Sequence, residues 1–185
     1  MPLRVIGGSL GGRTLRGPPR SGVRPTTDRV REALFEILAA RGTPMRRVLD
    51  LYSGTGALGI EALSRGGEYC DFVEADSKAC DVIRDNLRRT GLLDCTKLWP
   101  ITVARAIGRL EGPYELVVAD PPYEYDRAEA ELASLVEKGL LAEDGTLVVE
   151  HSQRKQWPLS LAGLEQVTSR RYGDTRITLY AKESS

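Results

Sequence analysis

Histidine, cysteine and long apolar runs are scarce in this sequence, and each scarcity excludes a class of protein. The single histidine is His151, and the three cysteines form no Cys-x-x-Cys pair. We therefore expect neither a zinc site nor a disulfide framework, and we predict that the chain binds no metal. No stretch approaches about 18 consecutive apolar residues, and the N-terminus has no apolar signal core. These two absences predict a cytoplasmic protein without a membrane span.

Net charge is zero, yet the charges are distributed unevenly along the chain. Residues 1–47 contain ten arginines, no lysine and three acidic residues, which gives +7, and residues 48–185 carry −7. Arginine can fork onto phosphates and stack on bases, so the basic segment predicts a polyanionic partner. We expect phosphate contacts from Arg4, Arg13, Arg24, Arg29 and Arg31. The alternative is that these arginines pair with the acidic remainder of the chain and hold the segment in place.

Hydrophobic periodicity predicts a basic extension, residues 1–45, followed by one α/β domain, residues 46–185. In the extension, residues 3–6 and 14–15 are the expected strands of a small hairpin, and Val30, Leu34, Ile37 and Leu38 share one face of a helix. In the domain, helices are expected at 57–65, 77–89 and 127–137, and strands at 48–51, 69–74, 98–103, 116–119, 146–150, 164–171 and 175–182. The last two strands meet at Gly173-Asp174, which predicts an antiparallel hairpin after a series of βα units.

A glycine-rich turn, Gly54-Thr55-Gly56-Ala57-Leu58-Gly59, follows the first strand of the domain. Glycines permit a tight turn and allow a ligand to approach the backbone closely. An acidic residue about 20 positions later is expected to end the next strand and bind ribose hydroxyls. Glu74 occupies that position, and Asp76 is a second candidate. The pattern predicts a nucleotide-like cofactor.

Asp50 separates two possible cofactors. A carboxylate immediately before the turn would repel the pyrophosphate of a dinucleotide. S-adenosylmethionine (SAM) has no phosphate but carries an ammonium and a sulfonium, with which a carboxylate is compatible. Asp50 therefore favours SAM over NAD. The alternative is that Asp50 only stabilises the turn.

A second motif, Asp120-Pro121-Pro122-Tyr123, follows the apolar run at residues 116–119. An exocyclic amine of a nucleobase is a poor nucleophile because its lone pair is delocalised into the ring. The Asp120 carboxylate and the Pro121 carbonyl are natural acceptors for the hydrogens of that amine as positive charge develops. Pro122 stiffens the loop, and Tyr123 can stack on an extracted ring. The alternative is a merely rigid exit from the strand.

Several segments together resemble a known family. They are Arg4-Val5-Ile6-Gly7-Gly8, Arg24-Pro25-Thr26-Thr27-Asp28-Arg29-Val30-Arg31-Glu32, the stretch from Leu49 to Gly66, Val73-Glu74, Asp120-Pro121-Pro122-Tyr123 and Tyr172-Gly173-Asp174-Thr175. The sequence resembles the bacterial SAM-dependent 16S rRNA (guanine-N2)-methyltransferases over nearly its whole length. The Arg-Pro-Thr-x-Asp-Arg-Val-Arg-Glu block is the most specific of these segments, since the other motifs occur in many amino-methyltransferases.

The resemblance implies a Rossmann-like class I methyltransferase with a seven-stranded, mostly parallel sheet and a small N-terminal hairpin and helix extension. It implies methylation of a guanine N2 in 16S rRNA, within the small ribosomal subunit or an assembly intermediate, and we expect a monomer. The expected cofactor contacts are Asp50, Tyr52, Ser53, Gly54, Gly56, Glu74, Ala75, Thr102 and Asp120. The sequence departs from the family at residues 101–104, where many members carry an Asp or Asn that contacts adenine, so Thr102 and the backbone are expected to hold the adenine.

Four other functions compete with this interpretation. A DNA amino-methyltransferase usually needs a target-recognition insertion, for which the chain has no room. A protein glutamine methyltransferase would not need the arginines of the extension. A small NAD-dependent reductase leaves Asp50 and the Asp-Pro-Pro-Tyr motif unexplained. An RNA-binding assembly factor without activity would not need Asp120, and SAM binding measured by calorimetry would separate it from the enzymes.

Overall fold

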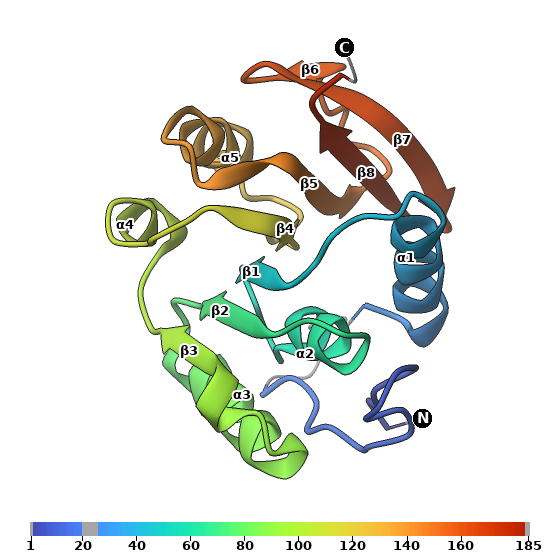
Figure 1. Cartoon of the computed structure of the whole chain (residues 1–185), viewed down its shortest axis with the longest axis vertical. Helices are drawn as coiled ribbons and strands as arrows, with labels where there is room; N and C mark the ends of the chain where they lie inside the picture. Colours follow the sequence, from blue (N-terminus) through green and yellow to red (C-terminus); the bar gives the residue numbers. More distant parts are fainter. Residues whose placement is uncertain (1, 20–25, 184–185) are drawn as a thin grey trace.

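Helices cover both faces of one eight-stranded sheet in the computed structural model, which describes residues 2–19 and 26–183 (Figure 1). The helices are α1 (Asp28–Ala40), α2 (Ala57–Ser64), α3 (Ser77–Thr90), the 3-10 turn η1 (Leu93–Cys95), α4 (Val103–Ile107) and α5 (Ala128–Glu137). The strands are β1 (Arg47–Leu51), β2 (Tyr69–Val73), β3 (Thr96–Trp99), β4 (Tyr114–Ala119), β5 (Leu141–Ser152), β6 (Ser160–Leu161), β7 (Leu164–Tyr172) and β8 (Thr175–Ala181). None of the described helices is both long and apolar enough to cross a membrane.

The strand order of the sheet is β3-β2-β1-β4-β5-β8-β7-β6. Pairings among β1 to β5 are parallel, whereas β8, β7 and β6 join in antiparallel fashion. This arrangement confirms the predicted mostly parallel sheet with an antiparallel hairpin at its C-terminal side. All seven strands predicted for the domain occur, and β6 adds a two-residue strand at the edge.

Side chains of the central strands point alternately to the two faces of the sheet, and each face has its own hydrophobic core. Leu116 and Val118 of β4 pack with α1, α2 and α3, whereas Val117 and Ala119 pack with α4 and α5. Figure 1 shows α1 and α2 on one side of the sheet and α4 and α5 on the other. A strand buried on both faces needs a continuous apolar run, which is why these strands were recognisable in the sequence. The four apolar residues predicted to share one face of α1 are all buried.

The third strand is shorter than its prediction. β3 ends at Trp99, and the expected strand positions beyond it turn into α4. The hydroxyl of Thr102 accepts a hydrogen bond from the backbone N–H of Arg105, so Thr102 is the N-cap of that helix. Threonine competes well for this capping position. Thr102 is therefore a helix-capping residue rather than a strand residue.

The N-terminal extension docks on α2. Its predicted hairpin is present but short: Arg4 and Thr14 form one antiparallel bridge, and backbone N–H groups of Leu15 and Val5 donate to the carbonyls of Leu3 and Arg13 on either side of it. A Cβ on Gly8 would lie 2.0 Å from the carbonyl oxygen of Ser64, so only glycine allows this close approach. Val5 and Leu15 are buried in the same core as α1 and α2. The division at residue 45 thus stays a proposal about function, since both parts share a core.

A buried ion pair holds the extension, α1 and α2 together. Every residue of α2 is buried, including Glu61, whose carboxylate accepts hydrogen bonds from the backbone N–H groups of Ile6 (2.8 Å) and Gly7 (2.9 Å). The guanidinium of Arg31, which is 0% exposed, lies 3.5 Å from Glu61 and 2.8 Å from Asp28. It also donates to the carbonyl of Arg4. The prediction that Arg31 contacts RNA phosphates is therefore wrong, because its guanidinium is buried and is paired with carboxylates of the protein itself.

We expect Glu61→Ala to lower the free energy of unfolding by about 3–5 kcal/mol, because the buried guanidinium of Arg31 would lose one of its two carboxylate partners and two backbone N–H groups of the extension would lose their acceptor. Urea denaturation followed by circular dichroism measures this quantity. Asp81→Ala is the matched control, since Asp81 belongs to an exposed pair with Arg84, and its loss should cost less than about 1 kcal/mol. Equal losses in the two variants would contradict the structural role of Glu61.

Candidate active site

Three adjacent parallel strands bring three carboxylates to the same end and the same face of the sheet. Asp50 lies in β1, Asp120 follows β4 directly, and Glu150 lies in β5. In the register of the sheet, Asp50 pairs with Val118, and the residue before Asp120 pairs with the residue before Glu150. Because side chains alternate along a strand, all three carboxylates face the side covered by α1 and α2. The carboxyl ends of parallel strands are where ligands bind in open α/β sheets.

The predicted glycine turn joins β1 to α2 and is held from inside. Its backbone has φ of 54° at Tyr52, 59° at Gly54 and 81° at Gly56. The Ser53 hydroxyl donates to the Asp50 carbonyl (2.6 Å), and the Asp50 carboxylate accepts from the Gly59 backbone N–H (2.9 Å). Asp50 is only 1% exposed, and burial raises its pKa well above its usual range. Its described contacts are those of a turn-stabilising residue, and a role beside a cofactor cation stays a proposal.

Glu74 directly follows β2, next to the turn. One carboxylate oxygen accepts from the backbone N–H of Gly54 (2.8 Å) and the other from that of Asp76 (2.9 Å). Each oxygen keeps a lone pair for a further donor, such as a ribose hydroxyl. A Cβ built on Gly54 would meet no atom within 4 Å, so a ligand has room against the backbone there. These residues fit the ribose of SAM, and Ala75 is exposed beside them.

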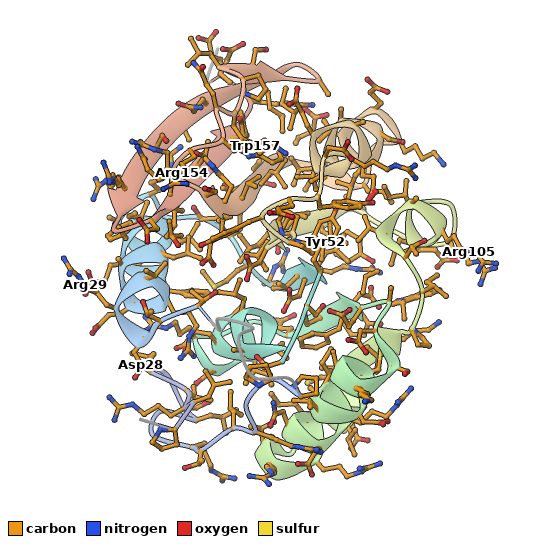
Figure 2. The ribbon with its side chains drawn as sticks, turned by 180° about the vertical axis from the view of Figure 1, so that it is seen from behind. Asp28, Arg29, Tyr52, Arg105, Arg154 and Trp157 are labelled. Atoms are coloured by element: carbon orange, nitrogen blue, oxygen red, sulfur yellow. The ribbon has the colours of Figure 1, made fainter. Side chains whose placement is uncertain are left out.

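A buried carboxylate fixes the loop that leaves β4. Glu131 of α5 accepts hydrogen bonds from the hydroxyls of Tyr52 (3.1 Å) and Tyr125 (2.7 Å). The two rings meet edge to face with centroids 5.8 Å apart. Hydrogen bonding to Glu131 is the main cause that raises the pKa of Tyr125 to about 12. Tyr52, which Figure 2 labels near the middle of the view, is half-buried, and through Glu131 and the Tyr125 ring it joins the glycine turn to the loop after β4.

The Asp-Pro-Pro-Tyr segment begins where β4 ends. The backbone N–H of Asp120 donates to the carbonyl of Leu51 (3.3 Å), which places the motif directly beside the glycine turn. Pro121 is buried and Pro122 is exposed. Tyr123 is 44% exposed, and its hydroxyl lies 2.7 Å from that of Thr175. An exposed, anchored ring at this place is suited to stacking against a planar group.

Thr26 reaches this site from the segment before α1. Its hydroxyl donates to the carboxylate of Glu150 (2.6 Å) and lies 3.5 Å from that of Asp120. Burial raises the pKa of Asp120 well above its usual range, and the charges of Glu150 and Asp50 raise it further. Burial also raises the pKa of Glu150. The site therefore contains closely spaced carboxyl groups in a poorly hydrated environment.

His151 does not face these carboxylates. Its two ring nitrogens lie 2.9 Å from the carbonyl of Ser152 and 2.8 Å from the hydroxyl of Thr178, and the side chain is buried. Burial lowers its pKa. His151 is therefore a buried, hydrogen-bonded structural residue. No group of three or more metal-ligating side chains occurs within residues 2–19 and 26–183.

The five arginines predicted to bind RNA differ in their exposure and in their protein partners. Arg29 is exposed, and Figure 2 shows it directed outward from α1. Arg4 is half exposed and pairs with Asp28 (3.1 Å). Arg13 is exposed and donates to the carbonyl of Arg89 (3.0 Å). Arg24 lies outside the described residues, and Arg31 is buried.

The fold and the cofactor turn are those of a SAM-dependent methyltransferase. The chain belongs to the family described as "Conserved hypothetical protein 95", whose pattern it matches over residues 3–181. It is 31% identical to the Ribosomal RNA small subunit methyltransferase D of Escherichia coli, over 98% of this chain and 91% of the relative.

Other comparisons agree with this family. The chain is 36% identical to the Bacillus subtilis protein named "Putative rRNA methyltransferase YlbH", over 97% of this chain and 99% of the relative. The solved structure of the Escherichia coli "Putative methyltransferase yhhF" superposes with a TM-score of 0.85 at 31% identity, covering 99% of both chains.

Sequence reasoning missed several residues that shape the site, above all Thr26, Glu131 and Glu150. Thr26 lies within the most family-specific block, and Glu150 ends a predicted strand at the same side as Asp120, so both had a positional signal. Asn86 was also missed. Its amide donates to the carbonyl of Thr55 (2.9 Å) in the glycine turn and to that of Arg16 (3.0 Å) in the extension.

We expect Glu74→Ala to weaken SAM binding at least tenfold, because hydrogen bonds to a charged acceptor contribute roughly 1.5–3 kcal/mol. Isothermal calorimetry with SAM measures the dissociation constant. Glu68→Ala is the control, since Glu68 is exposed and precedes the opposite end of β2. An unchanged dissociation constant for Glu74→Ala would remove this residue from the cofactor site.

Proposed function

We propose that this methyltransferase transfers a methyl group from SAM to the exocyclic N2 of a guanine in 16S rRNA of the small ribosomal subunit. The carrying observation is the Asp-Pro-Pro-Tyr segment, joined to the glycine turn by the Asp120 N–H···O=C Leu51 bond. The Escherichia coli relative named as a small-subunit rRNA methyltransferase supports the choice of substrate. Bound SAM supplies a methyl group on a sulfonium, which is transferable to a nitrogen nucleophile.

In this proposal, the Asp-Pro-Pro-Tyr segment acts on the guanine and the residues of the cofactor set bind SAM. Asp120 and the Pro121 carbonyl accept the two amine hydrogens, which lowers the cost of moving the lone pair out of conjugation. Pro122 stiffens the loop, and Tyr123 stacks on the guanine, which must leave its own stack to reach the site. Glu74, Gly54 and the rest of the predicted cofactor set hold SAM in line with the amine.

Exposed cations supply the affinity for the RNA backbone. Arg29 lies three residues after Thr26, so a phosphate bound there would flank the site. Arg4 and Arg13 lie in the same extension and add to its positive charge, although each already has a protein partner. We propose that the enzyme acts as a cytoplasmic monomer on the small subunit or an assembly intermediate, with contacts from this extension.

The direct test is incubation of the protein with labelled SAM and small subunits from a strain that lacks it. Nucleoside analysis of the 16S rRNA should then show N2-methylguanosine as the labelled product. Naked 16S rRNA and large subunits serve as parallel substrates. Label in another nucleoside, or in protein alone, would overturn the proposed substrate.

We expect Asp120→Ala to reduce turnover by about 100-fold or more, the scale of losing one transition-state acceptor. SAM affinity should change much less. Single-turnover methyl transfer and calorimetry measure the two quantities, and Asp126→Ala, an exposed acid six residues along the chain, is the control. If SAM affinity fell as much as turnover, Asp120 would be a cofactor or structural residue.

We expect Arg29→Ala to flatten the salt dependence of RNA binding by about 0.7–0.9 in log–log slope, because each phosphate contact releases counterions. The midpoint of thermal unfolding and SAM affinity should stay unchanged. Arg41→Ala is the control, since Arg41 is an exposed arginine at the other end of α1. An equal change of slope in both variants would show that net charge, rather than this position, determines RNA binding.

A further inference from the structure

A single hydroxyl links two carboxylates at the candidate active site. Thr26 Oγ1 lies 2.6 Å from one Glu150 oxygen and 3.5 Å from one Asp120 oxygen. The side chains come from the extension and from two neighbouring strands, and Thr26 and Glu150 are 9% and 8% exposed. A hydroxyl can accept one proton while it donates another, so this arrangement can conduct a proton from Asp120 to Glu150.

The charged groups around Asp120 and Glu150 act on the two carboxylates in opposite directions. Asp120 faces Glu150 on β5 and Asp50 on β1, and both like charges disfavour its ionised form. Glu150 receives the Thr26 hydrogen bond and the positive charge of Arg31 on α1, and both favour its ionised form. Of the two carboxylates, Glu150 is therefore the one favoured in its unprotonated form, in which it can accept a proton, while the substrate amine is expected at Asp120.

We propose that Thr26 and Glu150 are positioning residues for Asp120, and that Glu150 receives, through the Thr26 hydroxyl, the proton released by the methylated amine. This inference rests on the proposed function for the identity of the amine. It assigns a role beyond RNA contact to the family-specific block, because Thr26 belongs to that block and lies two residues before α1.

The proton balance of the step is complete within these groups. The amine nitrogen forms a bond to the methyl carbon while the sulfur–carbon bond breaks, and the sulfur keeps the electron pair. The nitrogen becomes positively charged and releases one proton to the Asp120 carboxylate. Asp120 passes a proton to Thr26 Oγ1 as the Thr26 hydroxyl proton moves to Glu150. Asp120 is then ionised again, and Glu150 loses its proton to water after the product leaves.

The test combines two measurements on Glu150→Gln, Thr26→Val and Thr26→Ser. Glu150→Gln keeps the shape but cannot take the proton, Thr26→Val removes the hydroxyl, and Thr26→Ser retains it. The first measurement is the single-turnover rate against pH. The second, which needs no substrate, is the titration of Asp120 followed by carboxyl carbon NMR in the full-length protein. SAM affinity and cooperative unfolding check that each variant is folded.

We expect Glu150→Gln and Thr26→Val to lower the plateau rate at least about tenfold, with Thr26→Ser close to the parent. In Glu150→Gln, Asp120 should titrate about one pH unit lower, because a neighbouring negative charge is gone. The acid limb of the rate profile should move in the same direction, since activity requires ionised Asp120.

A rate loss without a change in the Asp120 titration, or a changed titration without a rate loss, would overturn the inference. So would equal rates for Thr26→Val and Thr26→Ser. Failure of the proposed function is recognised separately, because the parent protein, without any substitution, would then label no guanine in 16S rRNA. In that case an Asp120 titration that is the same in the parent and Glu150→Gln overturns the inference, and a shifted one supports the coupling for whichever amine is methylated.

Discussion

The buried carboxylate of Glu61 is the interaction on which the placement of the N-terminal extension depends. It binds two backbone N–H groups of the extension and faces the fully buried guanidinium of Arg31 on α1. A charge without water must be compensated by such partners, so the extension and α1 have few alternative positions. Since Thr26 lies just before α1, the same interaction determines where its hydroxyl meets Asp120.

Parallel strand ends impose the second constraint on the molecule. β1, β4 and β5 run in parallel to one end of the sheet, and near that end Asp50, Asp120 and Glu150 lie on one face. Burial raises the pKa of all three groups. Such crowding costs stability, and proteins commonly accept that cost where ionisable groups perform chemistry. The hydrogen bonds from Tyr52 and Tyr125 to Glu131 hold the loop after β4 in place beside the glycine turn.

Charge counting identified the basic extension but did not distinguish its arginines. Arg29 and Arg31 are two positions apart on one helix and carry the same charge, yet one is exposed and the other is 0% exposed. The difference arises because Arg31 faces Glu61 on α2, a partner 30 residues away in the sequence. For Arg31 the structure decides between the two alternatives considered for the extension, because this arginine pairs with the body. Arg29 is exposed, and its contact with a polyanion stays a proposal.

The sequence by itself determined the order of strands and helices, the mostly parallel sheet, the glycine turn with Glu74, and the Asp-Pro-Pro-Tyr segment. These features depend on local periodicity and on fixed spacings between neighbouring elements. Only the tertiary structure decided that Thr102 caps α4 rather than ending a strand, that Arg31 is buried, and that Thr26 joins Asp120 to Glu150. The Thr26–Glu150 contact spans 124 residues, and a hydrogen bond between such distant residues exists only after the extension has packed against the sheet.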